Sequence, residues 1–407
     1  MLSNILNAVI PFLLLPVLTR YLTPAEYGEV AMFQTLLGVL GAFVGLSVVG
    51  AAGRKYYDDN LTDTEMGLYI GACLQVLVVS AAMVFVSIFF FRENLSIWLG
   101  LDKKWVLWTV GLSAFTVMMG LRLGQWQVRK KAKSYGVMQI SKSIADMGLS
   151  LLFVVILLLG ADGRITAQII ATGLLAAVAL LFLRKDKLLV FFAWNPSYHK
   201  EIIKFGAPLI PHIGGGFLLV SVDRFVINAE LGLAEAGVYM VAVQLAAGAA
   251  LVFDAVNKAY VPWLFEKLKE DDLEQKKKIV RYTYLWYLVI LAGTIVGFVA
   301  GPWLVGLVAG PGYEQAGEVI GWLLLGQAFG GMYLMVTNYI FYSRRTGLLS
   351  IATITSGLIN LAFLILLVEM FGLTGAAVSF SIAMAIRFLL TWWVAQKRHP
   401  MPWFNFN

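Results

Sequence analysis

The stretch Met66–Phe91, which reads MGLYIGACLQVLVVSAAMVFVSIFFF, contains no Asp, Glu, Lys or Arg. An α-helix rises about 1.5 Å per residue, so about 20 apolar residues cross the hydrocarbon core of a bilayer. The stretch therefore predicts a transmembrane helix. Further uncharged runs occupy Leu2–Thr19, Val30–Gly53, Ile165–Leu183, Phe205–Val222, Ala236–Phe253, Tyr282–Tyr313, Val319–Ser343 and Thr346–Val368.

The composition of the whole chain indicates the same class. Hydrophobic residues make up 60% of the sequence and charged residues 14%, with a mean hydropathy of +0.80. Soluble domains carry about 25% charged residues, so this balance is typical of a membrane protein. Shorter or interrupted apolar segments lie at about 105–128, 135–160 and 370–395. We therefore expect an all-α integral membrane protein with twelve transmembrane helices in two six-helix lobes.

A short phrase recurs half a chain apart. Its first copy is Arg20-Tyr21-Leu22 with Ala25-Glu26-Tyr27-Gly28, and its second is Arg224-Phe225-Val226 with Ala234-Glu235-Ala236-Gly237. Other glycine pairs keep the same offset of about 210 residues, which indicates a duplicated unit. Internal repeats of helices are a building plan of secondary transporters. We therefore expect an N-terminal lobe at 1–184, a basic cytoplasmic linker at 185–204, and a C-terminal lobe with a short tail at 205–407.

The net charge of +7 comes from basic residues placed as membrane topology requires, so we expect no nucleic-acid partner. If the N-terminus is inside, most Lys and Arg fall in the even-numbered connections and the C-terminal tail, as the positive-inside rule requires. Both termini are then cytoplasmic. Cys73 is the only cysteine, so neither an intramolecular disulfide nor a Cys-based metal site can form. No Gly-rich phosphate loop or catalytic constellation is present, and we expect a transporter with no cofactor and no metal rather than an enzyme.

Prolines occupy matching places in the first helix of each half. Pro11 and Pro16 lie in the first span; Pro208 and Pro211 lie in the seventh, before three glycines. Because proline removes a helix hydrogen bond, these positions are either hinges beside a central cavity or static kinks. His212 follows Pro211 and is either a pH-sensitive gate or a packing residue.

Three charged residues interrupt the fourth and fifth spans. Lys142 and Asp146 are four residues apart, so they share a helix face and either form an ion pair or line a cavity. Arg122 has no acidic residue nearby in the sequence, and we expect it to contact an anionic substrate. A charge at bilayer depth costs at least about 2.5 kcal/mol, so such residues usually face a protein interior or a cavity.

Other charges mark helix ends. Arg387 in the last span is either a second anion contact or a residue that extends to the interface. Asp254 and Lys258 close the eighth span, as solvated residues or as headgroup contacts.

Several motifs resemble those of the lipid-linked O-antigen repeat-unit flippases, within the multidrug/oligosaccharidyl-lipid/polysaccharide exporter superfamily. Leu22–Gly28 resembles the family's loop after span one, and Arg54–Tyr57 resembles its basic-aromatic end of span two. Asp223–Ile227, followed by Gly232 and Gly237–Tyr239, resembles its loop after span seven.

The resemblance implies two lobes around a V-shaped cavity and alternating access in a bacterial cytoplasmic (inner) membrane. It implies an undecaprenyl-diphosphate-linked oligosaccharide as substrate, and as partners membrane lipids and other polysaccharide assembly proteins. Arg20, Arg54 and Arg224 match basic positions of the family near the cavity and are either phosphate contacts or interface anchors. Asp223 beside Arg224 would neutralise part of its charge.

Two other functions stay open. A cation-coupled multidrug exporter would favour an acidic residue in span one, and Leu2–Thr19 has none. A polysaccharide polymerase or ligase would need a long external loop, whereas the external connections here are short.

Overall fold

The computed structural model describes the backbone of residues 2–343 and 347–404, and the side chains in these ranges except those of residues 2–9, Pro11 and His212. The described residues form helices joined by short connections, with no β-strand among them. They divide into two compact units, Met1–Gly214 (unit 1) and Gly215–Asn407 (unit 2).

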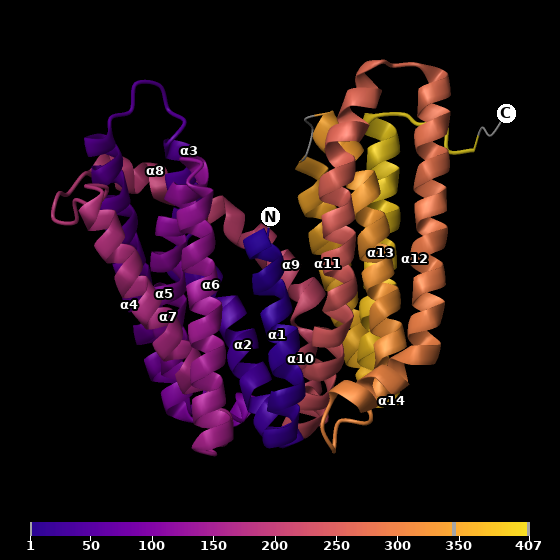
Figure 1. Cartoon of the computed structure of the whole chain (residues 1–407), viewed down its shortest axis with the longest axis horizontal. Helices are drawn as coiled ribbons and strands as arrows, with labels where there is room; N and C mark the ends of the chain where they lie inside the picture. Colours follow the sequence, from indigo (N-terminus) through magenta and orange to yellow (C-terminus); the bar gives the residue numbers. More distant parts are fainter. Residues whose placement is uncertain (1, 344–346, 405–407) are drawn as a thin grey trace. The chain divides into compact units, whose positions relative to one another are not determined.

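Unit 1 is built around α5, which packs against α2, α4 and α7, and these helices run side by side (Figure 1). The π-helix η1 directly continues α6, and the short 3-10 helix η2 follows α8. The elements are α1 (Leu2–Tyr21), α2 (Pro24–Gly45), α3 (Val48–Lys55), α4 (Asp63–Leu99), α5 (Lys103–Val128), α6 (Ala132–Ser150), η1 (Leu151–Ile156), α7 (Gly160–Lys185), α8 (Pro196–Gly206) and η2 (Ala207–Leu209).

Unit 2 is built around α13, which packs against α11, α12 and α14. The 52-residue α14 is two helices joined at Gly372, whose φ of 56° breaks the helical path. The elements that follow η2 are α9 (Ile210–Val220), α10 (Asp223–Glu230), α11 (Leu233–Lys269), α12 (Leu273–Val308), α13 (Ala316–Tyr342) and α14 (Gly347–Arg398).

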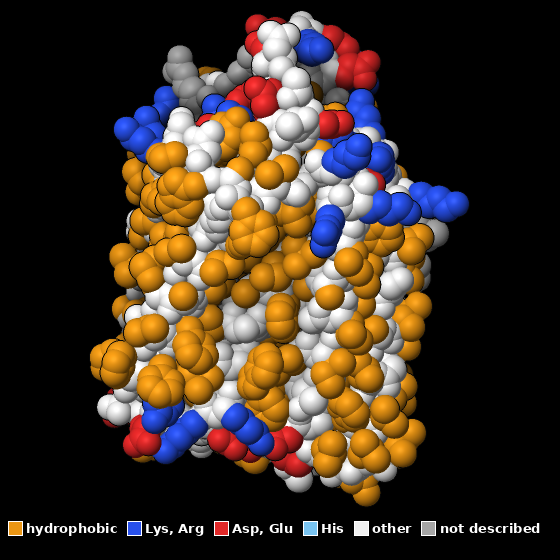
Figure 2. Space-filling model, turned by 90° about the vertical axis from the view of Figure 1, so that its left-hand side faces the viewer, with side chains coloured by type: hydrophobic (Ala, Val, Ile, Leu, Met, Phe, Trp, Pro, Cys, Tyr) orange, Lys and Arg blue, Asp and Glu red, His pale blue; other side chains and the backbone are white. Residues whose placement is uncertain are grey.

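Ten helices of the described chain are long and apolar enough to cross a membrane. On the face drawn in Figure 2, hydrophobic side chains form a broad band between two zones of charged side chains. A band of this kind is what a bilayer-spanning surface requires. The all-helical membrane fold is therefore confirmed. The count of twelve spans and the six-helix repeat stay predictions, because the ten spans count α14 once, although it is two helices joined at Gly372, and do not include α1.

The proline pattern has different consequences in the two halves. α1 continues as an α-helix through both Pro11 and Pro16. In the seventh span the α-helix changes to a 3-10 turn: α8 ends at Gly206, and η2 contains Pro208. Pro208 and Pro211 remove two backbone donors within four residues, and the tighter 3-10 turn lies there. In α1 the prolines are farther apart, and each removes one bond from an otherwise regular helix.

The connection after α7 packs against unit 1. The Val190 N–H donates to the Gly67 carbonyl over 3.1 Å, and a Cβ on Gly71 would lie 1.9 Å from the Val190 oxygen. Lys55 joins α3 to α8 through an ion pair with Glu201 at 3.1 Å. Burial opposes the charge of Lys55, but hydrogen bonds to Asp58 and Glu201 outweigh it and raise the pKa of this lysine. Residues 185–204 are thus part of the first compact unit.

Candidate functional site

The side chain of Arg122 is buried inside unit 1. Its side chain is 1% exposed, and its guanidinium forms an ion pair with Asp186, just after the end of α7. The guanidinium also lies 4.3 Å from the centroid of the Trp126 ring. Arg122 thus has an acidic partner, although no acidic residue lies near it in the sequence. The partner is 64 residues away in the sequence, and only the packing of α5 against α7 brings the two together.

Asp146 pairs with Arg164 rather than with Lys142. The Arg164 Nη1 donates to Asp146 Oδ1 over 2.9 Å, and both side chains are mostly buried. The same Nη1 lies 3.0 Å from the Ser150 hydroxyl oxygen. Of the two alternatives, the Lys142–Asp146 ion pair is not formed, because the planar guanidinium on α7 reaches both carboxylate oxygens of Asp146. Sequence reasoning missed Arg164, which stands near the start of its helix.

Lys142 is left half-buried on α6, facing no acidic group within ion-pair distance among the described side chains. It lies midway along the α6–η1 helix, which is long and apolar enough to span a membrane. A cation at this depth without a carboxylate partner can attract an anion.

Arg387 is the corresponding cation of unit 2. It is half-buried in the second part of α14, and its guanidinium lies 3.9 Å from the centroid of the Tyr333 ring on α13. Its Nε is buried without a hydrogen bond, and no described carboxylate lies within ion-pair distance of the side chain. Tyr333 supplies a cation–π contact that leaves the charge uncancelled. Arg387 therefore keeps a charge that no described carboxylate cancels, unlike Arg122.

Arg224 and Asp223 form a neutral pair at the start of α10. Both are buried, with 3.4 Å between Arg224 Nη1 and Asp223 Oδ1. Arg224 Nη1 also donates to the Val220 carbonyl over 2.8 Å. The guanidinium therefore helps to hold the turn between α9 and α10, and its charge is largely compensated.

The remaining candidates lie at exposed positions. Arg54 is exposed at the end of α3, and Arg20 is exposed while it donates to the Pro16 carbonyl over 2.6 Å. Asp254 and Lys258 form an exposed ion pair on α11. That helix continues to Lys269, so the pair stands within a helix rather than at its end.

The structure describes the side chains of only some of the proline and histidine candidates. Pro16 lies inside α1, and Pro208 and Pro211 lie at the α8–α9 interruption. The side chains of Pro11 and His212 lie outside the described residues.

The chain matches the family model described as "Polysaccharide biosynthesis protein" over residues 1–268. A relative from Haemophilus influenzae, named "Uncharacterized membrane protein", is 28% identical, with 87% of this chain and 85% of the relative covered. The "Putative O-antigen transporter" of Shigella flexneri is 22% identical, with 96% of both chains covered.

Two solved structures share the fold. The lipid II flippase MurJ in an inward closed conformation has a TM-score of 0.78 at 13% identity, with 97% of this chain and 87% of that chain covered. An inward-facing multidrug transporter of the MATE family has a TM-score of 0.76 at 14% identity, with 96% and 94% covered. At such identities the likeness shows the fold alone.

Proposed function

Because the chain belongs to the polysaccharide biosynthesis protein family, we propose that it is a flippase for lipid-linked oligosaccharides. Its substrate would be an oligosaccharide repeat unit on undecaprenyl diphosphate, moved from the inner to the outer leaflet of the bacterial cytoplasmic membrane by alternating access. The family match is the observation that carries this proposal. The relative named as a putative O-antigen transporter, similar along nearly its whole length, supports the same cargo class.

The intramembrane cations suit such a substrate. A diphosphate needs positive charge within the membrane, and Arg387 and Lys142 carry charges that no described carboxylate cancels. Arg387 can offer two parallel N–H donors to phosphate oxygens, whereas Lys142 acts as a point charge. We infer that these two residues contact the diphosphate. Arg122, paired to Asp186, stabilises unit 1 instead.

Deletion of the chain in its native host tests the proposal. We expect surface polysaccharide to fall and undecaprenyl-linked repeat units to accumulate on the cytoplasmic side, with both defects reversed by the wild-type protein. Normal surface polysaccharide with no accumulation would refute the flippase assignment. A raised sensitivity to cationic drugs, with polysaccharide unchanged, would favour the multidrug exporter of the same fold.

A further inference from the structure

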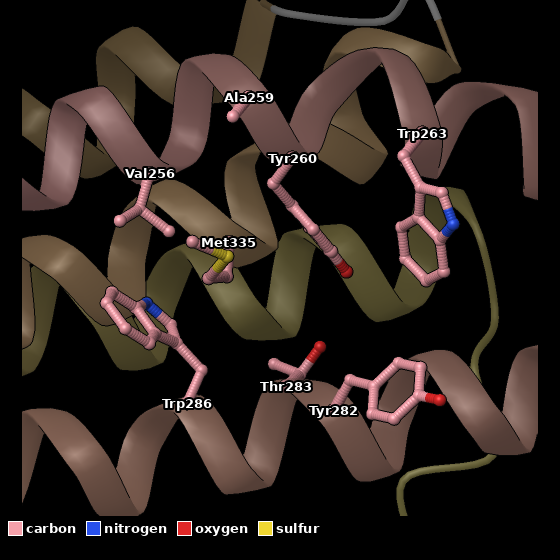
Figure 3. A pocket seen from close by; sticks show the side chains of 8 residues that line it. All are labelled: Val256, Ala259, Tyr260, Trp263, Tyr282, Thr283, Trp286 and Met335. Carbon is pink, nitrogen blue, oxygen red and sulfur yellow. The ribbon is translucent and has the colours of Figure 1, made fainter.

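An aromatic groove runs between α11 and α12 of unit 2. Both helices pack extensively on α13, but they contact each other over few residues, so their facing sides diverge. The space between them has a volume of about 540 Å³. Figure 3 shows Tyr260 and Trp263 extending from α11, Tyr282 and Trp286 from α12, and Met335 behind them.

The chemistry of the groove suits hydrocarbon. Its walls are aromatic or aliphatic and contain no charged side chain. The hydroxyl of Thr283 donates to the Ile279 carbonyl of its own helix over 2.9 Å, so it is already satisfied. The outer side of α12 beside the groove carries exposed Leu285, Leu288 and Val289, which indicates a surface that faces lipid.

A cation stands at one end of this groove. Lys278, Tyr282 and Trp286 follow one another at four-residue spacing, so they form a single stripe along α12. Lys278 is exposed, and no described acidic side chain lies within ion-pair distance of it, unlike Lys276 and Lys277. The stripe therefore leads from a free ammonium group into an apolar channel, the charge pattern of a lipid with an anionic headgroup.

We propose that this groove binds an anionic phospholipid of the membrane, with an acyl chain between α11 and α12 and the phosphate at Lys278. Tyr and Trp are common at membrane interfaces, and one lysine near a membrane surface contributes about 1 kcal/mol of attraction to anionic lipid. The proposal is independent of the transported cargo, since it concerns a resident lipid of unit 2.

The test uses the full-length protein in phosphatidylcholine nanodiscs that contain a small fraction of brominated phosphatidylglycerol. Bromine quenches nearby tryptophan, and Trp263 and Trp286 line the groove. We expect more quenching than from the same fraction of brominated phosphatidylcholine, and we expect the Trp263→Phe/Trp286→Phe variant to lose that excess. Equal quenching by the two lipids would overturn the proposal.

Two variants, each with a control, test the headgroup contact and the acyl-chain contact separately. Lys278→Gln should weaken the apparent affinity for phosphatidylglycerol about fivefold, whereas Lys133→Gln, which removes an exposed lysine of unit 1, should leave it unchanged. Ala259→Phe should fill the groove and abolish the excess quenching, and Val296→Phe, at a lipid-exposed site on α12, should not. Binding that survives Ala259→Phe would overturn the proposal.

A competition experiment distinguishes a phospholipid from an isoprenoid lipid in the groove. Added undecaprenyl phosphate should leave the phosphatidylglycerol signal of the wild-type protein unchanged. If undecaprenyl phosphate displaced phosphatidylglycerol, and did so equally well in Lys278→Gln, the groove would hold an isoprenoid chain. That result would refute the assignment to a phospholipid. Because Lys278 is exposed, Lys278→Gln is expected to fold even if Ala259→Phe does not.

Discussion

Arg122 in unit 1 and Arg387 in unit 2 are both arginines within apolar helices, yet their surroundings differ. Arg122 is closed off from solvent, carries an ion pair to Asp186 and rests on Trp126. Arg387 also rests on an aromatic ring, that of Tyr333, but has no carboxylate partner among the described residues. A buried charge with a partner is a structural element, whereas one without a partner costs stability and is usually retained for function.

The largest expected effect comes from removing the partner of Arg122. In Asp186→Asn the guanidinium stays buried without compensation, and we expect the free energy of unfolding to fall by about 3 kcal/mol. Thermal unfolding of the purified protein in detergent measures it. Asp63→Asn is the matched control: it breaks the Arg129–Asp63 pair, in which Asp63 is 72% exposed, and should cost less than about 1 kcal/mol.

A double variant sharpens that result. Arg122→Met with Asp186→Asn removes both charges and should recover most of the lost stability, because no unpaired charge then remains buried. If Asp186→Asn were no more destabilising than Asp63→Asn, the Arg122 ion pair would not be structural.

Arg387 should behave in the opposite way. We expect Arg387→Gln to lower export of the lipid-linked repeat unit at least about tenfold while thermal stability stays equal or rises, because an uncompensated charge leaves the membrane interior. Arg387→Lys, which keeps the charge, should retain part of the export. Repeat-unit accumulation in cells and unfolding of the purified variants measure the two effects. Full export by Arg387→Gln would remove this residue from the substrate path.

The two copies of the repeated phrase differ as well. Thr23 is the N-cap of α2 and forms a capping box with Glu26, whereas the N-cap of α11 is Gly232, which has a φ of 99° and makes no side-chain cap. We expect Gly232→Ala to cost about 2 kcal/mol through backbone strain and Thr23→Ala to cost about 1 kcal/mol through the lost cap. Gly216→Ala, in open space within α9, serves as the control and should be nearly neutral. Equal costs for Gly232→Ala and Gly216→Ala would contradict the strain argument.

The smallest expected effect depends on pH. Burial, together with repulsion by Lys276, lowers the pKa of His399 below its usual 6.5 in the folded protein. Folding thus favours the neutral ring, and its contribution to stability is complete above pH 6.5 and is lost as the pH falls through the lower folded value. Melting temperatures of the wild type between about pH 7 and pH 5 should fall slightly more than those of His399→Gln. Parallel curves would exclude this contribution.

Local patterns were enough to predict the class of fold. Uncharged runs such as Met66–Phe91 are long enough for a bilayer, and α4 covers that run. The uncharged run Ile165–Leu183 likewise lies within α7. These features could be predicted because helix formation in a membrane depends on residues that are neighbours in the sequence.

The chain's sequence by itself thus determined that this is a helical membrane protein, which segments are apolar, and where charges interrupt them. Only the tertiary structure decided which charges are cancelled. Arg122 forms an ion pair with Asp186, Asp146 forms one with Arg164, and Arg387 lies against the ring of Tyr333. The physical reason is that hydropathy is a property of each segment, whereas an ion pair depends on which helix faces lie against each other. Spacing along one helix allowed a Lys142–Asp146 pair, but packing against a second helix pairs Asp146 with Arg164 instead.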